Sequence, residues 1–202
     1  MFTPDATSPV TPSATSAPSA TEQAPAAAPQ PDRPKSSAGP EKTSPGELAM
    51  PRSAPIRLRI PKIGVDAPFI GLKIGPSGAL DPPPAHDTNL VGWQSGGISP
   101  GQRGTAIIAG HLDTATSPAV FARLTELSPG DRFEVDRVDG TTAVFLIDSV
   151  ESFDKDDFPD SRVYDDTPKA LARLITCAGA YDRQVRDYTE NLVVFAHLDE
   201  TA

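Results

Sequence analysis

The chain has 202 residues, 23 of them proline, and a formal net charge of -9. This acidic balance argues against nucleic acid as a partner, because phosphate binding relies on lysine and arginine. No run of 18 or more apolar residues occurs, and the N-terminus lacks the basic and apolar regions of a signal peptide.

Composition divides the chain into two parts. Residues 1–55 hold 12 of the 23 prolines and are otherwise dominated by Ala, Ser, Thr and Gly. Such a segment buries too little apolar surface to offset its ordering entropy, so we expect a disordered linker. This composition is typical of a stalk between a membrane anchor and an exposed domain, and a plain disordered tail is the alternative. Residues 56–202 are predicted to form one folded domain.

The first half of the folded segment predicts short strands. Residues 56–60 and 63–70 alternate apolar and polar side chains around Pro61, which indicates two strands joined at a kink. A stretch rich in Gly and Pro follows, with room for one short strand at 90–93. The apolar run 105–110 predicts another strand, and a histidine follows it directly.

The second half predicts further strands with little helix. Apolar residues at helical spacing over 120–124, after Ser117 as a candidate N-cap and Pro118 at the first helical position, predict one short helix. The stretch 132–150 reads as a β-hairpin with an Asp-Gly turn. A helical turn over 168–172 is the second helical candidate.

Two final strands are expected at 172–177 and 191–198, separated by a polar loop. The count of about eight short strands with one or two helical turns predicts a mostly β protein. Its most natural architecture is a closed or nearly closed β-barrel with loops at the rim.

Cys177 is the single cysteine of the sequence. A single cysteine excludes an intramolecular disulfide and any metal site built from several cysteines. The acidic residues are too dispersed to indicate a calcium site, so we expect neither a metal nor a cofactor. A lone cysteine is more often a buried core residue than a reactive thiol, so its neighbourhood must decide.

A nucleophilic thiol needs a base or a positive group beside it. Of the three histidines, His86 lies in a proline-rich loop and His197 in the last strand pattern. His111 and Cys177 each end an apolar strand, and strand ends can present two side chains to one pocket of a barrel. We therefore predict a pair of His111 and Cys177, with a core thiol and an exposed histidine as the alternative.

The polar loop after Cys177 contains Arg183 and Arg186. Either guanidinium offers a fixed positive charge that could stabilise an oxyanion. The alternative is that both are solvated loop charges.

These features resemble the sortase family through most of residues 56–197. The resemblance rests on five segments in family order: "IRLRIPKIGVDAPF", "VGWQSGGISPGQRGTAIIAGHLDT", "LSPGDRFEV", "LITCAGAYD" and "NLVVFA". Each is weak alone, and together with their spacings they are specific. The details resemble the actinobacterial branch called class F, in which a stalked domain follows an N-terminal membrane segment.

The resemblance implies an eight-stranded sortase barrel and a cysteine transpeptidase. Cys177 would attack the carbonyl of a sorting signal, commonly the Thr-Gly bond of Leu-Pro-x-Thr-Gly, and form a thioester. His111 would protonate the leaving amine and deprotonate the incoming one, since imidazole exchanges protons near neutral pH. The acceptor would be an amine of a cell-wall precursor or a pilin lysine.

The resemblance further implies an extracytoplasmic enzyme on the surface of a Gram-positive cell. A plasma-membrane anchor outside this sequence would tether it, and a monomer is expected.

One departure from the family concerns the essential arginine. Several sortase classes place it five residues before the alanine of the last strand, and here that position is Asn191. The class F pattern carries an arginine two residues before an aromatic residue, which Arg186 before Tyr188 matches. Arg186 is therefore the preferred candidate, and Arg183 is the reserve.

Three further residues are candidates for substrate binding. Asp113 and Thr176 flank His111 and Cys177, and Asn191 is the third. The alternative for Asp113 and Thr176 is that they only satisfy turn and strand hydrogen bonds.

Two other functions stay open from the sequence. A hydrolase would use the same thiol and histidine and release the product to water, and a non-catalytic wall-associated barrel would use neither. A papain-like protease is disfavoured, because there the cysteine precedes the histidine in the chain.

Overall fold

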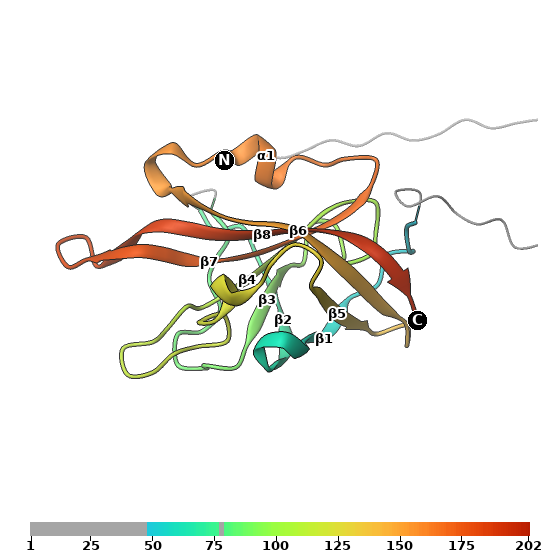
Figure 1. The fold of residues 1–202 in the computed structure, drawn as a ribbon, viewed down its shortest axis with the longest axis horizontal. Coiled ribbons are helices and arrows are strands. Elements are labelled where there is room, and N and C mark those ends of the chain that lie inside the picture. Colours follow the sequence, from blue (N-terminus) through green and yellow to red (C-terminus); the bar gives the residue numbers. More distant parts are fainter. Residues whose placement is uncertain (1–47, 77–78) are drawn as a thin grey trace, which may run out of the picture. The chain divides into compact units, whose positions relative to one another are not determined.

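The computed structural model describes residues 48–76 and 79–202. Most of the expected stalk, residues 1–47, lies outside the described residues. The strands of the described part close into one barrel in the order β1-β2-β3-β4-β7-β8-β6-β5 (Figure 1), which confirms the predicted fold class. They are β1 (Pro55–Ile60), β2 (Val65–Leu72), β3 (Val91–Gln94), β4 (Gly104–Gly110), β5 (Arg132–Arg137), β6 (Thr142–Asp154), β7 (Ala170–Asp182) and β8 (Asp187–Thr201).

Two of the strand pairs, β2 with β3 and β4 with β7, run parallel, and the other pairs are antiparallel. Parallel neighbours need long crossover connections. The connection from β2 to β3 and the connection from β4 to β5 provide loops at the same end of β4. These loops build one side of the candidate site described below.

Helical structure in the described residues is limited to short segments: the 3-10 turns η1 (Pro61–Ile63), η2 (Leu124–Glu126) and η3 (Lys155–Asp157), and the α-helix α1 (Asp160–Tyr164). The helix predicted from Ser117 onward is wrong, because Pro118 forms a bridge with Asp113 and only η2 follows. The apolar spacing that predicted it has another cause. Phe121 and Leu124 are fully buried core residues reached from irregular turns.

The helical turn predicted at 168–172 is also wrong. β7 begins at Ala170, and the short helix lies earlier, at α1. Ala170 and Ala172 face the core and pair with β4 at Gly104 and Ala106, which fixes this stretch as strand.

The polar loop predicted after Cys177 is mostly strand. β7 and β8 continue as a two-stranded ribbon that projects from the barrel (Figure 1), with Tyr181 opposite Tyr188 and Asp182 opposite Asp187. The two tyrosine rings meet edge to face with centroids 5.3 Å apart. Because these residues are largely exposed, they lack the alternation of apolar and polar residues that marks a half-buried strand.

Apolar side chains pack on both faces of the β7–β8 part of the barrel. The interior contains Ile108, Leu174 and the stacked pair Phe133 and Phe145, whose ring centroids lie 5.0 Å apart. A second cluster lies on the outer face, where α1 and η3 cover the sheet. It contains Val163, Val193 and Phe195, with Phe153, Phe158 and Ile175 packed against them.

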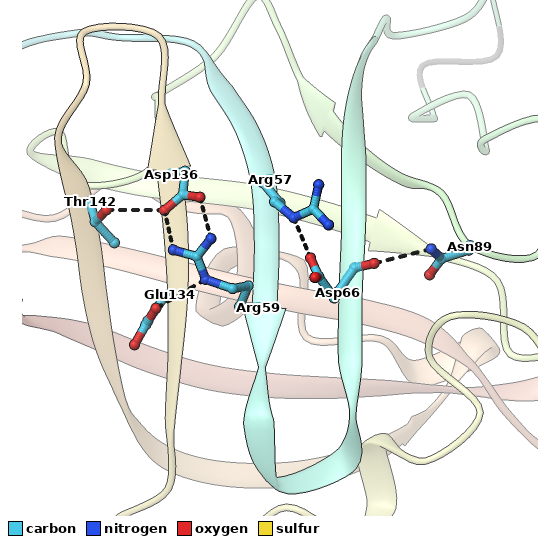
Figure 2. Close-up of polar contacts among 7 residues, drawn as sticks. All are labelled: Arg57, Arg59, Asp66, Asn89, Glu134, Asp136 and Thr142. Atoms are coloured by element: carbon cyan, nitrogen blue, oxygen red, sulfur yellow. Dashed lines mark hydrogen bonds and ion pairs between the residues drawn. The ribbon is translucent and has the colours of Figure 1, made fainter.

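Paired charges cover the outer face of β1, β2 and β5 (Figure 2). Arg57 pairs with Asp66, and Arg59 pairs with Glu134 and Asp136. Such solvent-accessible pairs contribute little to stability, because water screens the charges. They favour the register of β1 between β2 and β5 and leave this side of the barrel polar.

Residues 48–54, which the sequence placed in the linker, pack against the barrel. Met50 is buried in the core, and its N–H donates to the carbonyl of Gly101 at 2.8 Å. The guanidinium of Arg137 is buried beneath this segment, where it donates to the Met50 sulfur at 3.0 Å and to the Pro51 carbonyl. The packed part of the chain therefore begins before β1.

Candidate active site

A groove of about 930 Å³ lies on the outer face of β4 and β7. Its lining includes the apolar side chains of Ile107, Ala109 and Ile175, which belong to these two strands. The loop between β2 and β3 contributes Leu80 and Pro83 on one side, and α1 contributes Asp160 and Tyr164 on the other. The β7–β8 ribbon completes the groove.

All six residues predicted for the site line this groove: Cys177, His111, Arg186, Asp113, Thr176 and Asn191. Cys177 lies on β7 directly opposite Asn191 on β8, so both side chains point to the same face of the sheet. Thr176 is almost fully buried, and its Oγ1 has no hydrogen-bond partner among the described residues. Arg186 lines the groove, whereas Arg183 is not among its lining residues.

His111 lies directly after β4 and its ring is held by the β2–β3 loop. Its Nε2 is 2.7 Å from the carbonyl oxygen of Pro83. Because a carbonyl only accepts hydrogen bonds, this geometry requires a proton on Nε2. His111 therefore donates a hydrogen bond from Nε2 to the Pro83 carbonyl.

The other two histidines lie elsewhere. His86 is exposed in the β2–β3 loop. The Nδ1 of His197 lies 2.7 Å from a carboxylate oxygen of Asp148, and His197 on β8 pairs with Leu171 on β7, six residues before Cys177. At about 3.3 Å per strand residue, that separation is roughly 20 Å.

The thiol of Cys177 is partly buried, and burial raises its pKa above the usual cysteine range. The ammonium group of Lys155, whose Nζ lies 4.0 Å from Sγ, acts in the opposite direction. The carboxylates of Asp187 and Asp113 raise the pKa further.

The described residues contain no group of three or more His, Cys, Asp or Glu arranged to hold a metal ion. Among the same residues, no helix combines the length and the apolar character needed to cross a membrane.

A family model for the sortase domain matches residues 58–199, which is more than half of the chain. The chain belongs to the sortase family. Members of this family are cysteine transpeptidases, so the match supports that class of activity at the family level.

Solved sortase structures share the fold of this sortase. The lid mutant of Streptococcus agalactiae sortase C1 aligns with a TM-score of 0.54 and 18% identity over 76% of this chain and 72% of that one. Sortase C-1 from Actinomyces oris gives 0.53 and 22% over 71% and 73%. Sortase A from Listeria monocytogenes gives 0.54 and 16% over 74% and 90%. A search of curated proteins finds no match.

Two residues of this sortase site were missed from the sequence. Tyr188, noted only as the aromatic residue after Arg186, donates a hydrogen bond to the carboxylate of Asp113, which raises the pKa of Tyr188 to about 12. This contact ties the β7–β8 ribbon to the loop after His111. Lys155 is flanked in the sequence by acidic residues, and it belongs to none of the motifs from which the site was predicted.

Proposed function

We propose that this sortase cleaves a C-terminal sorting signal of the Leu-Pro-x-Thr-Gly type and transfers the acyl part to an amine, with Cys177 as nucleophile. The observation that carries the proposal is that Cys177 and the protonated Nε2 of His111 line one groove with an apolar floor. A peptide laid along β4 and β7 would place its leucine and proline on that floor.

The reaction needs an ionised thiol, so a proton must first leave Cys177, with His111 as the acceptor that the groove offers. The thiolate attacks the threonine carbonyl carbon, and the resulting oxyanion is stabilised by Arg186. The C–N bond then breaks as Nε2 gives its proton to the departing glycine amine. This leaves a thioester on Cys177 and a neutral imidazole.

The second half reverses these transfers. An amine attacks the thioester carbon while His111 takes the proton that the amine loses, and Cys177 departs as a thiolate. Asp113 and Asn191 line the peptide path on either side of the reacting atoms, and Thr176 borders it. The acceptor class we propose is a primary amine of a cell-wall precursor or a pilin lysine.

The setting we propose follows from the class F-like sequence pattern. The domain would act outside the cytoplasm at a Gram-positive cell surface, tethered through its proline-rich stalk. The positions of Arg186 and Tyr188 support this subclass.

The test is a sorting peptide incubated with and without an added primary amine, such as triglycine. We expect an amine-dependent product in place of the hydrolysed one, and no turnover with Cys177→Ala. Hydrolysis that is insensitive to amine would favour the hydrolase. A stably folded protein without turnover on any sorting peptide would favour a non-catalytic barrel.

A further inference from the structure

The end of β6 lies across β8 from Cys177. Phe153 on β6 pairs with Asn191 on β8, and Asn191 pairs with Cys177 on β7. Directly opposed residues in adjacent strands point to the same face of a sheet, so these three side chains share the outer face. Lys155 follows two residues after Phe153, at the start of η3.

Aromatic packing fixes the position of η3. Phe153 contacts the ring of Phe195 on β8 with centroids 6.2 Å apart, and Phe158 contacts Phe153 with centroids 5.9 Å apart. Phe153 and Phe158 both pack in the outer cluster beneath α1. Lys155 therefore extends from a segment that is anchored on both sides.

The ammonium group of Lys155 lies close to both Cys177 and Asp187. Its Nζ lies 4.0 Å from the Sγ of Cys177 and 2.6 Å from a carboxylate oxygen of Asp187. Its side chain is 27% exposed, so solvent screens these contacts only in part. A cation at this distance favours a thiolate over a thiol.

We propose that Lys155 is a catalytic residue that stabilises the thiolate of Cys177 through its charge. The proposal rests on the proposed function in one respect, since it takes Cys177 as the nucleophile. Lys155 keeps its proton throughout the reaction. It supplies the charge next to sulfur, while Arg186 on the ribbon is left to act on the carbonyl oxygen.

The groove that contains the thiol is also lined by other charged and titratable groups. Asp113 and His111 follow β4, Asp187 and Tyr188 belong to β8, Arg186 lies in the turn between β7 and β8, and Asp160 belongs to α1. The acidic groups among these oppose ionisation of the thiol, so Lys155 offsets them. Removing the Lys155 charge must raise the thiol pKa, and removing the Asp187 charge must lower it.

A structural role makes a different prediction. If the pair of Lys155 and Asp187 only ties η3 to the β7–β8 ribbon, then losing either partner breaks the same link. Lys155→Met and Asp187→Asn would then change thiol reactivity in the same direction. An electrostatic role of Lys155 predicts opposite shifts of the thiol pKa in these two variants, and a structural role predicts shifts in the same direction.

The experiment measures the rate of iodoacetamide alkylation of Cys177 from pH 6 to 10, which needs no peptide substrate. For Lys155→Met we expect the apparent thiol pKa to rise by about one pH unit and alkylation at pH 7.5 to slow about tenfold. For Asp187→Asn we expect a lower pKa and faster alkylation. Lys155→Arg should stay within about threefold of the wild type.

The matched control is Lys62→Met, which removes a lysine paired with Asp131 outside the groove. It should leave the alkylation profile unchanged. An unchanged profile in Lys155→Met, or shifts of the same sign in both partners, would overturn the proposal. The conservative Lys155→Arg and Asp187→Asn variants keep the test decisive if Lys155→Met melts early.

Peptide cleavage separates this proposal from the proposed function. If Lys155 acts as proposed, Lys155→Met lowers kcat for a sorting peptide about tenfold, and raising the pH restores part of it. If wild-type protein with a normal alkylation profile never forms a peptide adduct, the proposed function fails. If it forms the adduct and Lys155→Met is unaffected in both assays, only the role of Lys155 fails.

Discussion

Arg186 adopts a left-handed backbone conformation, with φ of 58°, in the turn between β7 and β8. A non-glycine residue in this region costs roughly 1 kcal/mol. The side chain of Arg186 lines the groove from this strained position. Arg183, at the other side of the turn, does not line the groove. This difference supports Arg186 as the arginine that contacts the substrate carbonyl.

We predict that Arg186→Gly lowers the cleavage rate of a sorting peptide by about a hundredfold or more, because one oxyanion donor is lost. Glycine accepts a positive φ, so the melting temperature should stay equal or rise slightly. Arg186→Lys should rescue poorly, since lysine lacks the planar fork of donors.

The matched control for Arg186 is Arg183→Ala, which should cost less than tenfold as an exposed turn charge. Both variants are compared by fluorogenic cleavage rates after a folding check. If Arg183→Ala loses activity and Arg186→Gly keeps it, then Arg183 contacts the substrate carbonyl and Arg186 is the exposed turn charge.

At the residue scale, strand ends and family motifs predicted six candidate residues, and these line one groove. His111 and Cys177 each follow an apolar strand, and parallel pairing of β4 with β7 brings those ends together. The sequence does not indicate that Lys155 lies near Cys177, because this contact depends on the pairing of β6 with β8 and on the aromatic packing of η3. Contacts between segments far apart in sequence leave no local pattern.

α1 is the element that forms the groove wall opposite the β2–β3 loop. It has only five residues, from Asp160 to Tyr164, which is too short for an isolated helix to be stable. Val163 attaches it by packing, fully buried, against Val193 and Phe195. The wall therefore depends on tertiary contacts.

We predict that Val163→Ala lowers the free energy of unfolding by about 1–3 kcal/mol and raises KM for the peptide. Val135→Ala, in the barrel interior, is the matched control. It should cost similar stability and leave KM unchanged. Denaturant unfolding and steady-state kinetics measure both, and equal KM effects in the two variants would argue against α1 as a substrate wall.

The elements themselves were predicted unevenly. The hairpin of β5 and β6 has clear alternation and an Asp-Gly turn, and it formed as expected. The helix expected after Ser117 failed, because helical spacing of apolar residues also arises where irregular turns direct Phe121 and Leu124 into the core. α1 was missed, because its formation depends on the outer cluster and not on its own sequence.

At the scale of the whole molecule, residues that precede β1 pack against the barrel and contact the buried side chain of Arg137. Arg137 is 1% exposed, and burial lowers its pKa. Its hydrogen bonds go to Met50, Pro51 and Thr141, with Asp139 at 3.6 Å as its ion-pair partner. Met50 and Pro51 therefore accept hydrogen bonds from this buried guanidinium, whose Nε has no hydrogen-bond partner among the described residues.

We predict that deleting residues 1–47 leaves the melting temperature unchanged, because that segment is rich in Pro, Ala, Ser and Thr and poor in large apolar residues. Deleting residues 1–51 should lower it by roughly 10 °C, since a buried guanidinium loses partners worth about 3 kcal/mol. Differential scanning calorimetry of both truncations checks this. Equal melting temperatures would show that the segment does not stabilise the barrel.

Cys177 is proposed to carry the acyl group between a sorting peptide and an amine. The most direct measurement is the intact mass of the protein after brief mixing with a sorting peptide and no amine, followed by acid quenching. We predict a mass increase equal to the peptide portion up to threonine, located on Cys177, absent in Cys177→Ala and discharged by added amine. An unmodified Cys177 together with cleaved peptide would contradict the claim.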